Sequence, residues 1–165
     1  MSIADAVARA GEYLGGHPNE ARYRDSAARA RLTSGLVVDV TGPTGESLQT
    51  DMPTGIGGTA TAPSPGWYLR AAAASCVASL VAIRAAATGV ALRSVDVEVD
   101  SESDDRGILG LDPAIPAGAL LVRVVITIAA DADRATSEAI ARWAVDHCPV
   151  TESLSRAVPL EVKVG

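Results

Sequence analysis

The chain has 165 residues, of which 48% are hydrophobic, but its aromatic residues are only two Trp and three Tyr, with no Phe. This length can bury the core of a single domain, which must then be filled by Val, Leu, Ile and Ala. The formal charge of −6 and the pI near 4.8 argue against a nucleic-acid partner, because binding to a phosphate backbone needs a basic patch.

The N-terminal residues show no pattern of export or of a membrane anchor. Asp5 and Glu12 lie in the first segment, which lacks a basic stretch followed by an apolar one. The most apolar run, residues 71–87, is interrupted by Arg84 and falls short of the roughly 18 residues of a membrane span. We therefore expect a cytoplasmic protein without a membrane partner and without a structural disulfide.

The first third of the chain is predicted to be a helix followed by a small antiparallel meander. Apolar residues repeat with helical spacing over residues 3–14, before a Gly-Gly pair and a proline stop the helix. Residues 1–20 are thus expected to form an N-terminal helical extension. Turn signals and β-branched residues predict strands at residues 28–33, 36–40 and 48–51. Residues 52–66 hold four Gly and three Pro, which predicts a long irregular loop of the kind that often carries function.

The rest of the chain is predicted to alternate between long strands and helices. A helix over residues 67–88, ended by Gly89, has apolar residues nearly all the way round and is expected to be central and buried. Strong β patterns follow at residues 90–100 and 120–129, joined by a long polar and Gly/Pro-rich connection. The last elements expected are a helix at 134–147, a short helix capped by Thr151, and a strand at 160–164. The order indicates one α+β domain over residues 1–165.

Motifs for several common chemistries are absent, which leaves the two cysteines. Cys76 and Cys148 lack the partners that a zinc site needs at its usual spacing. No G-x-S-x-G, G-x-G-x-x-G or Walker motif indicates a serine hydrolase or a nucleotide site. The cysteines are either small buried hydrophobic residues or a redox pair. Cys76 lies too deep in its helix for the helix dipole to ionise it, so a reactive Cys76 needs a cation from elsewhere.

The residues around both cysteines resemble those of one family. The motif P-x-P-G-W-Y-L-R-A-A-A-A-S-C, residues 63–76, opens the long helix, and H-C-P-V occupies residues 147–150. From about residue 27 to 164 the chain is similar to a divergent branch of the OsmC/Ohr family, the osmotically inducible and organic hydroperoxide resistance proteins. The resemblance implies antiparallel sheets wrapped around two long central helices in an intertwined homodimer, with two sites at the subunit interface.

The same resemblance implies thiol-dependent reduction of organic or inorganic hydroperoxides in oxidative stress defence, without a metal or other cofactor. Cys76 takes the peroxidatic role and Cys148 the resolving role, and an external dithiol reduces their disulfide. Characterised family members carry a Glu ten residues before the reactive Cys, which orients an activating Arg, but this chain has Gly66 there. Arg70, four residues later, is our candidate binding residue. The alternative is a non-catalytic dimer that binds a small apolar ligand in the interface pocket and keeps both cysteines for packing.

Overall fold

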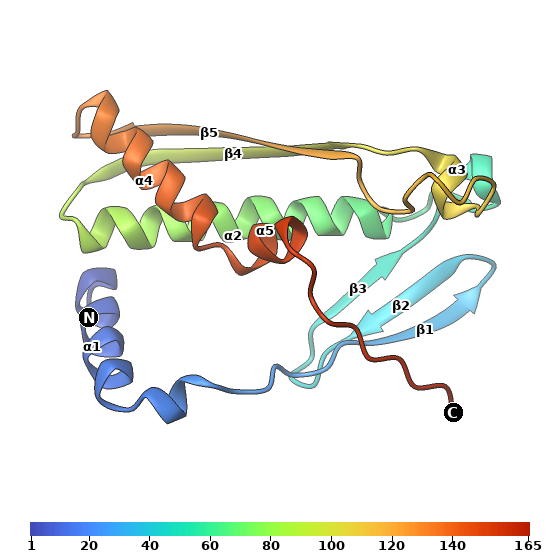
Figure 1. Cartoon of the computed structure of the whole chain (residues 1–165), viewed down its shortest axis with the longest axis horizontal. Coiled ribbons are helices and arrows are strands. Elements are labelled where there is room, and N and C mark those ends of the chain that lie inside the picture. Colours follow the sequence, from blue (N-terminus) through green and yellow to red (C-terminus); the bar gives the residue numbers. More distant parts are fainter. The chain divides into compact units, whose positions relative to one another are not determined.

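The computed structural model describes all residues, 1–165, and divides into two compact units, which are described separately. One unit is Ala10–Leu69, and the other combines Met1–Arg9 with Arg70–Gly165. Figure 1 labels the elements, which are α1 (Ile3–Gly16), a 3-10 turn (Pro18–Ala21), β1 (Arg29–Ser34), β2 (Val37–Thr41), β3 (Ser47–Thr50), a second 3-10 turn (Thr54–Ile56), α2 (Pro65–Ala87), β4 (Leu92–Glu102), α3 (Asp105–Ile108), β5 (Leu121–Ala130), α4 (Arg134–Asp146) and α5 (Pro149–Ser155). The α+β class is confirmed, while the single domain stays a prediction.

The unit Ala10–Leu69 contains the predicted meander. Its three strands form an antiparallel sheet in the order β1-β2-β3, with Ala30 opposite Val40 and Val40 opposite Leu48. The turn between β1 and β2 contains Gly35, whose φ of +56° favours glycine. The three predicted strands are therefore confirmed to within one residue at each end.

The long loop after β3 is ordered around one buried carboxylate. Asp51 is 1% exposed and accepts hydrogen bonds from the backbone N–H groups of Met52, Thr59 and Thr61 and from both threonine hydroxyls. These donors hold the pKa of Asp51 far below its usual range, with the Thr59 side chain as the largest cause and against the opposing effect of burial. Gly58 lies so close to the Met52 carbonyl that a Cβ could not fit. The irregular loop that the sequence predicts is thus a defined structure with a single 3-10 turn.

Helix α2 begins two residues earlier than predicted and ends at Ala87, one residue earlier than predicted. The Ser64 hydroxyl accepts a hydrogen bond from the N–H of Trp67, and Pro65 occupies the first helical position, so the cap moves the start to Pro65. At the other end Gly89 has a φ of +72°, and the N–H of Val90 returns to the Ala85 carbonyl.

The prediction that α2 is buried all round is only partly met within one chain. Its buried residues lie four apart along one side of the helix; they are Ala73, Val77, Val81 and Ala85. Ala72, Ser75 and Ser79 on another side are exposed. By length and composition α2 would also pass as a membrane span, as the core helices of soluble proteins do. Its packing against the core, described next, favours a core helix.

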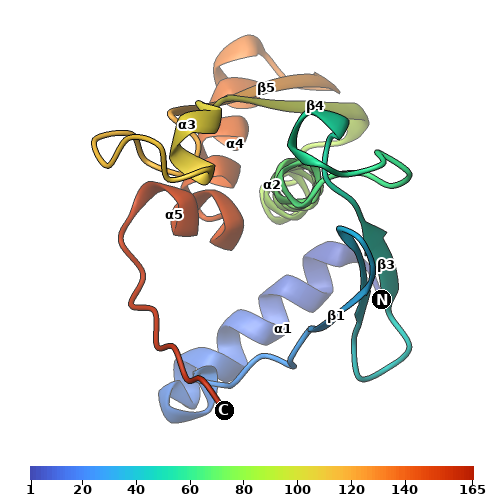
Figure 2. The ribbon, with the colours of Figure 1, turned by 90° about the vertical axis from the view of Figure 1, so that its right-hand side faces the viewer.

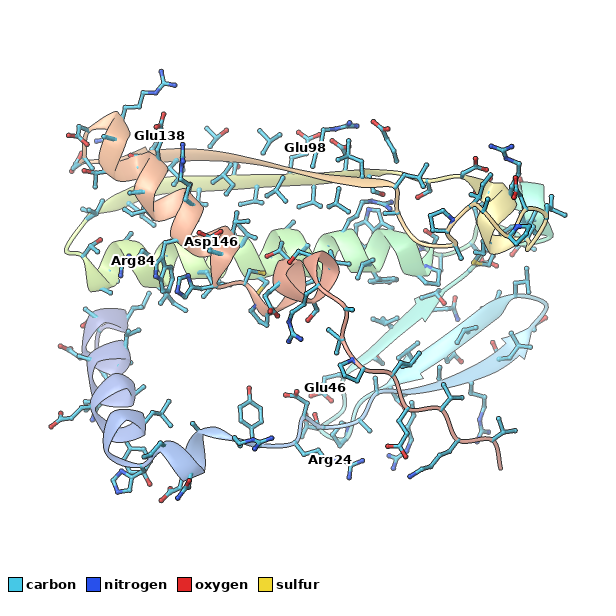
Figure 3. The ribbon with its side chains drawn as sticks, in the orientation of Figure 1. Arg24, Glu46, Arg84, Glu98, Glu138 and Asp146 are labelled. Atoms are coloured by element: carbon cyan, nitrogen blue, oxygen red, sulfur yellow. The ribbon has the colours of Figure 1, made fainter.

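The core of the unit with Arg70–Gly165 lies between α2, α4 and one face of a two-stranded antiparallel sheet. Strands β4 and β5 pair along their whole length, with Val97 opposite Ile126. Figures 1 and 2 show α2 and α4 on the same side of this pair. The side chains of β4 that point the other way are charged, as Glu98 shows in Figure 3. The core residues on α4 and after it are again spaced by four, namely Ile140, Ala144 and Cys148.

Two predicted elements differ from the structure. Residues 160–164 form no strand: they pair with no strand of this chain, and Leu160 and Val164 are 88% and 95% exposed. The last helix starts at Pro149 with Cys148 as its cap, three residues before the expected start, since Pro suits the first position of a helix. The connection between β4 and β5 also contains the short helix α3, which Asp104 caps.

Candidate functional site

The structure brings Cys76 and Cys148 together where α2 meets the end of α4. Cys148 is the last of the buried residues spaced by four that begin at Ile140. Cys76 lies directly before the buried Val77 on α2 and packs against the core cluster to which Cys148 belongs. Both thiols are free. Cys148 is fully buried, whereas Cys76 is half-buried. The two cysteines that the sequence singled out thus face one another within a single chain.

The turn that carries Cys148 is fixed by Thr151. The Thr151 N–H donates to the Cys148 Sγ at 3.5 Å. The Thr151 hydroxyl lies 2.8 Å from the Val145 carbonyl oxygen and 3.2 Å from that of Cys148, so it connects the last turn of α4 to α5. The sequence analysis missed this role of Thr151. The signal that could have shown it is Pro149, because a proline in the first helical position places the cap, and hence Cys148, three residues before Thr151.

The two thiols differ in their tendency to ionise. Burial raises the pKa of the Cys76 thiol, and Cys148 raises it further. Burial acts in the same direction on Cys148 but is outweighed by the hydrogen bonds from Thr151, Cys76 and Val150, so the pKa of Cys148 lies below its ordinary value. Each thiol is among the groups that shift the pKa of the other, so the two side chains lie close together. In this chain the negative charge is therefore easier to place on Cys148.

A stack of side chains anchors the end of α4 one turn before Cys148. The Trp143 and His147 rings are parallel to within 16°, with centroids 4.2 Å apart. The guanidinium carbon of Arg84, a residue of α2 that Figure 3 labels, lies 5.0 Å from the centroid of the Trp143 ring, within cation–π range. The His147 Nδ1 is 2.8 Å from the Trp143 carbonyl oxygen, so that nitrogen carries the hydrogen. Arg84 and His147 are thus both engaged with Trp143.

Arg70, the predicted binding residue, has another partner in this chain. Its Nη1 donates a hydrogen bond to the Ser101 hydroxyl at 3.2 Å, which ties the start of α2 to the inner face of β4. No charged side chain is among the groups that shift the pKa of either thiol. The structure therefore shows Arg70 as a link between elements, and its role at the thiols stays a prediction.

A cavity of about 290 Å³ is lined by residues of the other compact unit, not of the unit that contains the two cysteines. It belongs to the unit Ala10–Leu69 and is lined by the residues just before β1, such as Ala28, and by the β2–β3 hairpin, including Val40 and Leu48. Neither thiol nor Arg70 lines it. The thiol pair is therefore the candidate functional site.

Comparison with protein families agrees with the fold and includes both cysteines. Residues 58–163 match the family described as OsmC-like protein. The chain belongs to this family. The matched segment contains α2, the β4–β5 pair and α4, so the two thiols lie within the part that defines the family. Comparison with curated proteins gives no match.

Solved structures of the family share the fold at low sequence identity. An OsmC-like protein from Mycoplasma pneumoniae is 13% identical with a TM-score of 0.69, over 81% of this chain and 89% of that one. An organic hydroperoxide resistance protein from Elizabethkingia anophelis is 16% identical with a TM-score of 0.64, over 80% and 89%. One named OsmC from Legionella pneumophila is 20% identical with a TM-score of 0.58, over 81% and 90%. At these identities the similarity shows the fold alone.

Proposed function

We propose that this protein is a thiol-dependent peroxidase that reduces organic or inorganic hydroperoxides in oxidative stress defence. The observation that carries the proposal is the pair of free thiols in contact, one half-buried and one fully buried, at the meeting point of α2 and α4. A sulfenate formed on Cys76 would lie beside the Cys148 thiol. Some of its structural relatives are named organic hydroperoxide resistance proteins, which also supports a role in the reduction of hydroperoxides.

In the proposed reaction the Cys76 sulfur attacks the terminal oxygen of the hydroperoxide. The O–O bond breaks, the alcohol leaves, and Cys76 becomes a sulfenic acid. The Cys148 sulfur then attacks the Cys76 sulfur, water leaves, and a disulfide forms within the chain. An external dithiol reduces it, so two electrons pass from dithiol to peroxide without a further cofactor. The reducing cytoplasm is the compartment that we propose, because it returns both thiols to the reduced state.

Access decides which thiol attacks first. Cys148 is fully buried, whereas Cys76 retains some exposure, so a hydroperoxide reaches Cys76 more easily. The raised pKa of Cys76 opposes this role in the single chain. We therefore propose that the working protein is a homodimer and that the partner subunit supplies a cation near Cys76, since this chain places none there.

Counting thiols after exposure to a hydroperoxide tests the proposal. The purified protein is treated with one equivalent of cumene hydroperoxide, and free thiols are counted under denaturing conditions. Wild type is expected to lose both thiols, Cys148→Ser to stop at a Cys76 sulfenate that dimedone traps, and Cys76→Ser to keep its thiol. Unchanged thiols in wild type would contradict the proposal and favour the non-catalytic dimer that binds a small apolar ligand.

A further inference from the structure

The turn between α4 and α5 holds Cys148 by one bond to its sulfur and by others that do not involve the sulfur. The Cys148 Sγ caps α5 by accepting the Thr151 N–H at 3.5 Å, a weak bond because a thiol sulfur is a poor acceptor. The Thr151 hydroxyl lies 2.8 Å from the Val145 carbonyl oxygen and 3.2 Å from that of Cys148. Thr151 therefore contacts the last turn of α4, the backbone of Cys148 and its sulfur.

These two kinds of bond respond differently when a disulfide forms. Both thiols are free in this structure. Non-bonded heavy atoms stay about 3.5 Å apart, whereas the sulfurs of a disulfide are about 2.05 Å apart, so the two sulfurs have to approach each other. A weak bond to the Cys148 sulfur gives way to that movement, but the bonds of the Thr151 hydroxyl end on backbone oxygens and need not change. The hydroxyl can thus hold the Cys148 backbone in both redox states.

Little else fixes α5 to the end of α4. The helix has seven residues, none of them fully buried, and a helix this short is not stable by itself. Val150 packs against the core cluster, and Thr151 makes the one side-chain hydrogen bond from α5 to α4. The Ser153 hydroxyl, by contrast, donates to the Pro149 carbonyl at 2.6 Å and stays within α5. The place of the Cys148 backbone relative to α4 therefore depends on the Thr151 hydroxyl.

We propose that Thr151 is a positioning residue for the second step of the reaction, in which Cys148 attacks the Cys76 sulfenic acid. This inference rests on the proposed function. In that step the S–S bond forms, the S–O bond breaks, and the hydroxide that leaves takes the proton of the Cys148 thiol to give water. In the competing step the Cys76 sulfenate attacks a second hydroperoxide, which releases a second molecule of alcohol and leaves a sulfinic acid. Thr151 keeps the Cys148 sulfur within reach, so that the disulfide forms first.

The rates of the two steps separate this role from a contribution to stability. In Thr151→Val we expect sulfenate formation at Cys76 to keep its wild-type rate. Disulfide formation should slow by about tenfold, because a misplacement of about 1 Å between reacting groups can cost as much as 100-fold. With excess cumene hydroperoxide, Cys76 of this variant should accumulate as the sulfinic acid, whereas wild type should end as the disulfide.

Two further variants serve as controls for the hydroxyl. Thr151→Ser keeps the hydroxyl and should restore the wild-type rate of disulfide formation. Ser153→Ala removes a hydroxyl that bonds to a carbonyl within α5 and reaches neither α4 nor the sulfur, so it should behave as wild type. Equal rates of disulfide formation in Thr151→Val and wild type, or an equal slowing in Ser153→Ala, would overturn the inference and leave the proposed peroxidase intact.

Oxidation by diamide tests the inference without a hydroperoxide. Diamide converts the two thiols directly to the disulfide, and circular dichroism checks that each variant is folded. The disulfide should form about tenfold more slowly in Thr151→Val than in wild type, Thr151→Ser or Ser153→Ala. A variant that is only less stable opens more often and exposes the buried Cys148, which speeds its reaction with diamide. Equal or faster oxidation of Thr151→Val would therefore overturn the inference. If diamide gives the expected order while a hydroperoxide leaves all thiols unchanged, the proposed function fails and Thr151 still positions the pair.

Discussion

At the scale of single residues, the hydroxyl of Thr151 connects the two helices on either side of Cys148. It is half-buried and lies within hydrogen-bond distance of the Val145 and Cys148 carbonyl oxygens. Thr151→Val keeps the shape but removes the hydroxyl donor, so the Val145 carbonyl loses its shorter hydrogen bond and keeps the one from the Cys148 N–H at 3.3 Å. We expect a loss of about 1–2 kcal/mol in the free energy of unfolding. Thr151→Ser retains the hydroxyl and should fall within about 0.5 kcal/mol of wild type. Denaturant unfolding of both measures this, and equal stabilities would contradict it.

Asp51 gives a second prediction at this scale, and its pH dependence has a definite sign. Its pKa is lowered in the folded chain, so its contribution to stability is complete above about pH 4, the ordinary pKa of an Asp. That contribution is lost only as the pH falls toward the lowered folded value. Asp51→Asn replaces an acceptor with an NH₂ group that cannot serve the five donors. We expect its stability to lie below wild type by a constant amount from pH 5 to 8, and hydrogen exchange over residues 52–61 to accelerate. Unchanged exchange would show that the loop does not depend on this carboxylate.

At the scale of elements, Trp143 holds the end of α4 against α2 by stacking with His147 and under the Arg84 guanidinium. Trp143→Ala should lower the free energy of unfolding by about 2 kcal/mol. This loss is smaller than that expected on replacing a fully buried Trp, because the Trp143 side chain is only half-buried. It should also slow formation of the Cys76–Cys148 disulfide by diamide. Trp143→Phe keeps an aromatic face and should recover most of both quantities. Failure of Phe to recover either would show that the ring face is not what matters.

The sequence predicted the elements whose pattern is long and local. The apolar run of α2, its Gly89 stop and the alternation in β4 and β5 need no distant partner to be recognised. The strand expected at residues 160–164 is absent, because alternation shows which side chains suit a strand but not whether the segment lies beside an edge with which it can pair. For the site, the sequence indicated both cysteines. The contacts of Arg70 with Ser101 and of Thr151 with Val145 could not be predicted, because they depend on how helices pack.

At the scale of the whole molecule, α2 has a side that this chain does not cover. Ala72, Ser75 and Ser79 are exposed along it. Both serine hydroxyls turn back to carbonyls of their own helix, so this side offers small residues with satisfied polar groups. Such a surface lets a second helix approach closely, as the proposed homodimer requires.

We expect the protein to be a dimer in solution and Ser79→Arg to convert it to a monomer, because the long charged side chain would lie between the helices. Thr127→Arg, on the exposed outer face of β5, is the matched control and should remain dimeric. Light scattering after size exclusion gives the mass directly. A monomeric wild type, or a Ser79→Arg variant of unchanged mass, would exclude α2 as the dimer contact.

The central claim is that the Cys76 and Cys148 sulfurs meet and bond within one chain when a hydroperoxide is reduced. The most direct measurement is mass spectrometry of peptides from wild-type protein digested without reductant after one equivalent of cumene hydroperoxide. The account predicts a single linked pair containing Cys76 and Cys148, together with one equivalent of the alcohol. Cys76 found as a sulfinic or sulfonic acid beside a free Cys148, or both cysteines recovered as free thiols, would contradict it.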